Sequence, residues 1–310
     1  EKQAGAILDM RLYKLIGLEI EALQAEYQET MRNIALYQDI LNNYDSMAAV
    51  ITRELDAIKK EYGSKRRTSV ENAEEAVYEE KKMEETEVCF LMDRFGYMKL
   101  IDKNAYERNK EAAHNENRCV FLCMNTDKIC IFTDKGKMHS IKAADIPLVR
   151  FRDKGTPADN LSNYDSSQER MLYVAPLGQI RQDQLLFVTR ASMCKLVEGT
   201  EFDVAKRTIA ATKLAQDDEL VFVGSAGEME QVVFQSNGGY FLRFLKQEIS
   251  TARRAALGVH GMKLAQEDYV EHAYLLSGHQ EYAISYHDRE YPLNKVRLGK
   301  RDTRGIKPRS

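Results

Sequence analysis

The sequence predicts an α + all-β protein, in which a helical segment precedes a larger β domain made of repeated, propeller-like blades. The first 62 residues contain no proline and place apolar residues at steps of three and four, the period of a helix face. After Glu87 the pattern changes to short apolar runs bounded by polar turn residues, which is typical of strands. Hairpin signals then recur at the 40 to 50-residue spacing of propeller blades.

Composition indicates a globular protein of about two domains. The 310 residues are 44% hydrophobic and 30% charged, and no apolar run approaches the roughly 18 residues of a membrane-spanning helix. The 45 basic and 48 acidic residues give a net charge of -3, so bulk charge points to no nucleic-acid partner. Five cysteines, an odd number, fit a reducing cytoplasm. A start at Glu1 without Met suggests a fragment of a longer chain.

Residues 1–63 are expected to form two helices. One apolar stripe extends from Ile7 to Leu41 and a second from Val50 to Tyr62, with capping residue types between them at 42–46. Gly63 is the expected C-cap. A short break between long helices predicts an antiparallel pair, serving either as an ordinary bundle face or as a projecting coiled coil with a dimer contact.

Residues 64–87 form a predicted charged linker. A basic cluster at 65–67 precedes an acidic run from Glu71 to Glu87 that contains eight glutamates and two lysines. This reversal of charge sign separates the helical segment from the β domain.

Residues 88–310 are predicted to form about five blades. The expected turn residues Gly96, Gly136, Ser192 and Gly239 are 40, 56 and 47 residues apart, and a fifth hairpin begins at Tyr286. The run Lys-Leu-Ala-Gln-Asp-Asp at 213–218 returns as Lys-Leu-Ala-Gln-Glu-Asp at 263–268. Stacked blades bury the faces that a single small sheet leaves exposed. The alternative is chance similarity of short β stretches.

No motif in the sequence predicts catalysis or metal binding. Cys119 and Cys123 share one face of a predicted strand, where they are expected to be core residues, and Cys130 stands on another strand. The six histidines show no zinc spacing. No nucleophile elbow, phosphate loop or dinucleotide fingerprint is present.

Basic residues fall at the same phase of successive repeats, and the same phase means the same place on each blade. This predicts a basic belt for DNA phosphates, whose affinity would fall steeply with salt. The alternative is that these residues merely decorate connecting loops. The belt residues are Arg150, Arg152, Lys154, Lys206, Arg207, Lys213, Arg253, Arg254, Lys263, Lys295, Arg297, Lys300, Arg301, Arg304 and Lys307.

Two segments near the N-terminus resemble the bacterial type IIA topoisomerase A subunits. Residues 3–19 are similar to the family's Q-A-x-A-I-L-D-M-R-L-x-x-L-x-G-L-E segment, which runs into the coiled coil of the C-gate, and residues 62–68 to its Y-G-D-x-R-R-T. Residues 146–161 resemble the connection I-P-x-x-x-R-x-x-K-G-x-P-x-x-N-L of the family's C-terminal domain, a β-pinwheel, and 207–214 and 258–264 match later blades. The resemblance implies a helical C-gate segment followed by a β-pinwheel that binds and bends duplex DNA.

The subtype expected from the resemblance is topoisomerase IV rather than gyrase. Gyrase A subunits carry a Q-R-R-G-G-K-G box in the first blade, needed for wrapping. At that position this chain has a degenerate stretch, Glu107, Arg108, Asn109, Lys110, Glu111, Ala112 and Ala113. The nearest basic substitute, at 300–305, lies in another blade and is interrupted by Asp302. A gyrase whose A subunits have a degenerate box remains the alternative.

The resemblance also implies what the chain lacks. The family's nucleophilic tyrosine would lie upstream of Glu1, so no catalytic residue is assigned and this fragment alone is expected to be inactive. ATP and Mg²⁺ would be bound mainly by the partner B subunit. The expected partners are double-stranded DNA, the B subunit of the enzyme and, through the C-gate, a second copy of the chain. The expected location is the cytoplasm, in association with the nucleoid. A protein-interaction scaffold is the competing class of function.

Overall fold

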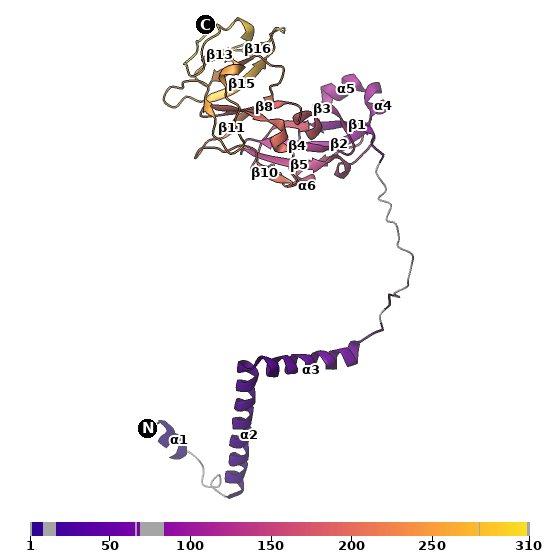
Figure 1. Cartoon of the computed structure of the whole chain (residues 1–310), viewed down its shortest axis with the longest axis vertical. Helices are drawn as coiled ribbons and strands as arrows, with labels where there is room; N and C mark the ends of the chain where they lie inside the picture. The colour runs from indigo at the N-terminus through magenta and orange to yellow at the C-terminus, as the bar shows by residue number, and fades with distance from the viewer. Residues whose placement is uncertain (1, 9–16, 66, 69–83, 279, 309–310) are drawn as a thin grey trace. The chain divides into compact units, whose positions relative to one another are not determined.

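The computed structural model describes residues 2–8, 17–65, 67–68, 84–278 and 280–308 (Figure 1). The chain divides into two compact units, Glu1–Glu80 and Lys81–Ser310. The predicted combination of helices followed by small antiparallel sheets is confirmed. Part of the N-terminal resemblance, at residues 9–16, and most of the acidic run, at 69–83, lie outside the described residues.

The first unit consists of α1 (Lys2–Leu8), α2 (Gly17–Asn42) and α3 (Tyr44–Tyr62). Asn43 caps α3, and its side chain accepts a hydrogen bond from the backbone N–H of Asp45 at 3.1 Å. Gly63 ends α3 with its N–H bonded to Lys59 O, although its φ of -63° is not the left-handed conformation of a typical glycine cap.

The predicted antiparallel pairing of these helices is wrong. Figure 1 draws α2 and α3 meeting at an open angle, and apolar residues of both, such as Leu23 and Leu55, are exposed. The physical reason is the length of the break. Asn43 alone separates the helices, whereas reversing direction takes a loop of two to five residues.

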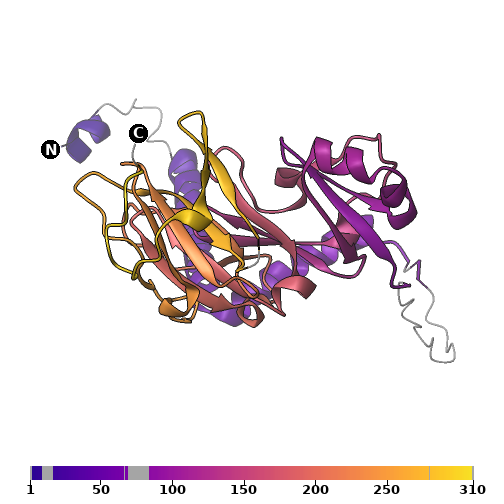
Figure 2. The same cartoon turned by 90° about the horizontal axis from the view of Figure 1, so that it is seen from above.

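Over its described residues, 84–278 and 280–308, the second unit contains five small antiparallel sheets. In hydrogen-bonded order, the first sheet is β3 (Asn117–Met124), β1 (Glu87–Asp93), β2 (Tyr97–Asp102) and β6 (Thr156–Pro157), and the second is β10 (Thr208–Ala210), β5 (Lys137–Lys142), β4 (Lys128–Thr133) and β7 (Met171–Pro176). The third sheet is β11 (Leu220–Ser225), β8 (Gln184–Thr189), β9 (Met193–Glu198) and β14 (Val259–His260). The fourth is β13 (Phe241–Leu245), β12 (Gln231–Ser236) and β15 (Val270–Leu276), and the fifth is the hairpin of β16 (Ala283–Tyr286) and β17 (Arg289–Pro292). Figure 2 shows the sheets following one another in chain order, from purple to yellow.

Short helices connect the strands. They are α4 (Lys103–Arg108), α5 (Lys110–Glu116), η2 (Ala143–Asp145), α6 (Ala158–Leu161), α7 (Leu177–Ile180), η3 (Gly199–Phe202), η4 (Lys246–Glu248) and η5 (Leu293–Lys295).

Each sheet is built around a hairpin at a predicted turn position. Gly96, Gly136 and Gly239 have φ of 83°, 69° and 79°, and Ser192 adopts the same left-handed conformation at 68°. The predicted hairpin at Tyr286 turns at His287 and Asp288, both of positive φ, as in a type I′ turn. The turn positions predicted from the sequence are therefore confirmed.

The strands interleave along the chain. The second strand of a hairpin pairs with a closing strand that the chain supplies only after it has made the next hairpin: β6 closes on β2, β10 on β5 and β14 on β9. In the fourth sheet a bridge between Ile306 and Phe241 takes this place. The chain therefore passes from each sheet to the next and back again, and apolar clusters pack between neighbouring sheets.

The sequence echo has a structural role. Asp217 and Glu267 stand at the same place in it, with φ of 59° and 63°. The next residue in each copy caps a hairpin turn: Asp218 accepts a hydrogen bond from the backbone N–H of Ala191, and Asp268 from that of Gly238.

Candidate nucleic-acid interface

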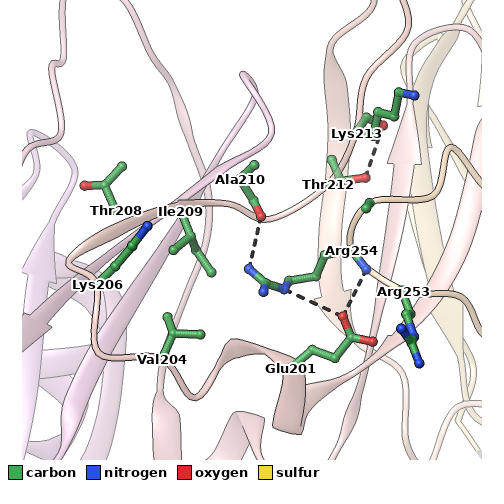
Figure 3. A pocket seen from close by; sticks show the side chains of 11 residues that line it. Glu201, Val204, Lys206, Thr208, Ile209, Ala210, Thr212, Lys213, Arg253 and Arg254 are labelled. Atoms are coloured by element: carbon green, nitrogen blue, oxygen red, sulfur yellow. Dashed lines mark hydrogen bonds and ion pairs between the residues drawn. The ribbon is translucent and has the colours of Figure 1, made fainter.

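A groove in the β domain gathers basic residues from two successive repeats (Figure 3). Its volume is about 1230 Å³, and its wall includes Lys206, Lys213, Arg253 and Arg254. Glu201 is the one acidic residue in that lining, so the charged groups of the wall sum to +3 (four basic residues less one acidic). The two pairs of basic residues are about 40 residues apart in sequence and meet because β10 and β14 close adjacent sheets.

The basic residues of three sheets stand on equivalent segments, which we call rim loops: residues 148–155, 251–258 and 298–305. Each rim loop begins at a parallel bridge to the second hairpin strand, made by Leu148, Thr251 or Leu298. Each ends at a glycine before the closing strand or, in the fourth sheet, before the Ile306 bridge. The equal lengths place equivalent residues at equivalent points.

The second residue after each bridge is an exposed cation. These residues are Arg150, Arg253 and Lys300, one in each rim loop. Their equivalence explains why the basic clusters fall at one phase of the sequence repeat.

The glycine that ends each rim loop is required by close packing. A Cβ on Gly155, Gly258 or Gly305 would lie 2.4 to 2.5 Å from the carbonyl oxygen of Met98, Cys194 or Phe241. Gly258 and Gly305 also have φ of 94° and 80°. Each rim loop therefore packs directly on the hairpin strand beneath it.

Arg254 and Arg301 are half-buried and are engaged within the protein. Arg254 donates to Ala210 O at 3.3 Å and lies with its Nε 3.6 Å from the Glu201 carboxylate. Arg301, its equivalent in the next rim loop, donates to Glu248 O at 2.9 Å and to His260 O. Both side chains thus reach from their own rim loop to the closing strand of the preceding sheet.

The other thirteen belt residues are exposed. Three of them lie over aromatic rings: Lys154 is 4.4 Å from the ring centre of Tyr97, and Arg304 and Lys307 are 4.5 and 5.7 Å from that of Tyr240. Arg207 forms an exposed ion pair with Asp145 at 3.7 Å. The remaining exposed residues are Arg150, Arg152, Lys206, Lys213, Arg253, Lys263, Lys295, Arg297 and Lys300.

The structure does not bring all fifteen belt residues into one site. The groove holds four of them, and the others stand on the remaining rim loops, beside the closing strands and at the C-terminal end of the described chain.

The degenerate box position is helical. Residues 107–113 span the end of α4 and most of α5, with Asn109 at the junction donating to Ala105 O at 2.8 Å. Ala113 is fully buried and packs in an apolar cluster of the first sheet. Two acidic and two basic side chains, all exposed, cancel one another over this stretch, which leaves no net positive charge there.

Sequence reasoning missed four residues that shape the rim loops. Glu201 and Glu248 bind the backbone N–H groups of Arg254 and Arg301 at 3.0 and 2.9 Å. The ammonium groups of Lys99 and Lys195 bind rim-loop carbonyls. The two lysines could have been found from the sequence, because each stands three residues after a predicted turn residue, Gly96 or Ser192.

Cys119, Cys123, Cys130 and His139 are engaged in packing and hydrogen bonding within the β domain. Cys119 and Cys123 pack in one apolar cluster, as predicted, and burial raises the pKa of Cys123 and of Cys130 to about 12. His139 is buried between Glu169 and Thr208, 3.1 Å from each.

Over the part of the chain that the structure describes, no group of three or more His, Cys, Asp or Glu side chains is placed to hold a metal ion, and no helix is long and apolar enough to cross a membrane.

Comparison with known proteins gives consistent matches. The family described as DNA gyrase C-terminal domain, beta-propeller, matches residues 127–166, 183–226 and 230–277. The DNA gyrase A protein of Clostridium acetobutylicum is 32% identical over 84% of this chain and 33% of its own length, and that of Deinococcus deserti is 30% identical over 91% and 36%. The chain thus spans about a third of the curated relatives that it matches.

A solved structure agrees on the fold. The C-terminal domain of a DNA topoisomerase IV superposes with a TM-score of 0.63 at 23% identity, covering 72% of this chain and 73% of that one. The solved structure shows the fold, and the matched family model and DNA gyrase A relatives identify the β domain of this chain as a C-terminal β-pinwheel domain of the type IIA topoisomerase A-subunit family.

Proposed function

We propose that the β domain binds duplex DNA on the basic belt, within the A subunit of a topoisomerase IV-like enzyme. The observation that carries the proposal is the groove in which Lys206, Lys213 and Arg253 converge from two successive sheets. The one acid of its lining, Glu201, is already bound to Arg254. The exposed cations are therefore available to phosphates, the groups that dominate DNA affinity.

The repeated rim loops favour a DNA path that crosses several sheets. Arg150, Arg253 and Lys300 occupy the same position on three of them. A duplex that contacts them in succession has to follow their curve, and bending 20 to 30 base pairs costs about 1 to 6 kcal/mol. Phosphate contacts offset this cost, and because residues 107–113 carry no net positive charge we expect weak bending.

We assign the chain a role in strand passage as part of a larger enzyme. In it, the belt holds duplex DNA while the exposed apolar side chains of α2 and α3 contribute to self-association at the C-gate. The cleaving tyrosine lies elsewhere in the A subunit, and the B subunit supplies ATP hydrolysis and Mg²⁺. Decatenation and relaxation are the activities that this arrangement serves.

The preference for a topoisomerase IV-like enzyme over gyrase rests on residues 107–113. The relatives from Clostridium acetobutylicum and Deinococcus deserti are gyrase A proteins, but this chain has α4 and α5 at the box position, with Ala113 in the core and charges that cancel. A wrapping element needs exposed basic charge to hold DNA. The stretch offers none in excess, which supports relaxation over supercoiling.

Charge reversal in the groove tests the DNA-binding proposal. The belt variant is Lys206→Glu with Arg253→Glu, and the matched control is Arg32→Glu with Arg53→Glu, two exposed residues of α2 and α3. Both variants change the net charge equally. We expect the belt variant to lose affinity for every duplex sequence and to reduce the slope of log K against log salt by about two units. The control should retain the wild-type slope.

Equal binding by the two variants would overturn the proposal. Absence of salt-dependent binding by the wild-type protein would do the same and would favour a protein-interaction scaffold.

A further inference from the structure

Lys195 is a buried cation in the core of the third sheet. Its side chain is only 1% exposed, yet its ammonium group donates to Arg253 O at 3.1 Å, Arg254 O at 2.7 Å and Ala256 O at 2.7 Å. Burying a charge is costly unless it is fully bonded. The three carbonyls belong to one rim loop. Two of them also accept backbone hydrogen bonds, Arg253 O from Ala256 and Arg254 O from Lys213, so the ammonium group adds to the bonds that hold this loop. The lysine and the rim loop thus satisfy one another.

Lys99 repeats this arrangement in the first sheet. Its ammonium group donates to Phe151 O at 2.5 Å and Asp153 O at 2.9 Å. Phe151 and Arg254 are equivalent, each three residues after the bridge that begins its rim loop. Lys99 and Lys195 are equivalent as well, each paired with the first hairpin strand at the same register, opposite Leu91 and Phe187. Two independent sheets therefore use one device.

We propose that Lys99 and Lys195 are positioning residues of the basic belt. Each fixes the backbone of a rim loop so that the exposed cation of that loop, Arg150 or Arg253, faces solvent where a phosphate can bind. This inference rests on the proposed DNA-binding function. Both lysines act through the loop that they hold, and the ammonium group of Lys195 is too deeply buried to reach a phosphate itself.

Lys246 provides a matched control. Its ammonium group also donates to two carbonyls, Ala226 O at 2.6 Å and Gly227 O at 2.8 Å, but these belong to a turn without basic residues. Lys195→Met and Lys246→Met therefore remove the same charge and the same kind of contact. Only the first removes an anchor of the belt.

DNA binding and hydrogen exchange together test the assignment. Lys195→Met is expected to lower the salt slope for a mixed-sequence duplex by about one unit, as if a phosphate contact were lost, and to speed amide exchange within residues 251–257. Lys246→Met should leave the slope and the exchange of 251–257 unchanged. With Arg253→Ala already present, Lys195→Met should add little further loss, because the two changes act through the same contact.

A merely stabilising lysine gives a different result. Lys195→Met would then lower thermal stability while the folded protein retained the wild-type salt slope and the protection of 251–257, and the assignment would be overturned. If Lys195→Met does not fold, Lys99→Met takes its place, since Lys99 is only half-buried. Arg150→Ala is then the second substitution, and amide exchange is measured over residues 149–154. An unchanged slope and unchanged exchange in that variant would overturn the assignment equally.

Failure of the proposed function would be recognised separately. Wild-type protein without salt-dependent DNA binding would refute DNA binding by the belt. The exchange experiment needs no DNA and would still decide whether the lysines hold the rim loops.

Discussion

The carboxylate of Glu201 accepts a hydrogen bond from the backbone N–H of Arg254 at 3.0 Å and lies 3.6 Å from the Nε of its guanidinium group. The same contact returns 47 residues later, where Glu248 accepts from the backbone N–H of Arg301 at 2.9 Å. In both sheets the acid stands in the 3-10 helix after the hairpin and the arginine in the rim loop. The contact divides the basic residues of the rim loops into those engaged within the protein, Arg254 and Arg301, and those whose side chains are exposed, such as Arg253 and Lys300.

Substitution of adjacent arginines should separate these two roles. Arg253→Ala is expected to reduce the salt slope of DNA binding by about one unit without changing the free energy of unfolding. Arg254→Ala should lower the free energy of unfolding by about 1 kcal/mol, because it removes a hydrogen bond and an ion pair whose side chains are 29% and 30% exposed. Denaturant titrations and anisotropy on the same samples provide the comparison. Identical effects of the two substitutions would contradict the division.

The glycine at the end of a rim loop should tolerate no side chain. Gly258→Ala is expected to destabilise the β domain by more than about 1 kcal/mol, because its Cβ would meet Cys194 O at 2.4 Å in a backbone of positive φ. Gly5→Ala is the control, since nothing lies within 4 Å of a Cβ there. The measurement is the urea midpoint of unfolding of the β domain. A wild-type midpoint for Gly258→Ala would show that the rim loop does not pack as described.

Lys195 should give the protein a recognisable pH dependence. Burial lowers its pKa to about 8, against about 10.4 for an unfolded lysine. Between these values the unfolded state binds more protons, so the free energy of unfolding should rise with pH from 8 to about 10.4. The difference between wild type and Lys195→Met isolates this contribution from other titrating groups. A difference that stays constant over this range would contradict the lowered pKa.

The box position predicts little DNA wrapping. With residues 107–113 helical and free of net charge, plasmid ligated in the presence of increasing protein should show no progressive change in linking number. The experiment resolves ligated topoisomers on a gel over a range of protein to DNA ratios. A linking-number change that grows with protein would contradict the topoisomerase IV-like preference and favour gyrase.

Hairpins were predictable from the sequence because their signals are local. Gly96, Gly136 and Gly239 mark turns that need positive φ, and apolar runs on either side mark the strands. The repeat then predicted that basic residues would share one phase, and the rim loops show the geometry behind it.

Closing strands were not predictable, for two physical reasons. β6 and β14 have two residues each, too few to show any periodicity, and β6 contains Pro157. Their pairing joins residues about 60 positions apart, such as Tyr97 and Pro157. The engagement of Arg254 depends in the same way on Glu201, 53 residues earlier. A sequence pattern reports which residues are charged, whereas the fold decides which charges are already paired.

The most direct test of DNA binding by the belt measures, by fluorescence anisotropy, how the affinity of the wild-type chain for a mixed-sequence duplex of about 40 base pairs changes with salt concentration. The belt predicts that log K falls linearly with log salt, with a slope of several units that is the same for unrelated sequences. No binding at low salt, or binding without salt dependence, would contradict a phosphate-binding belt.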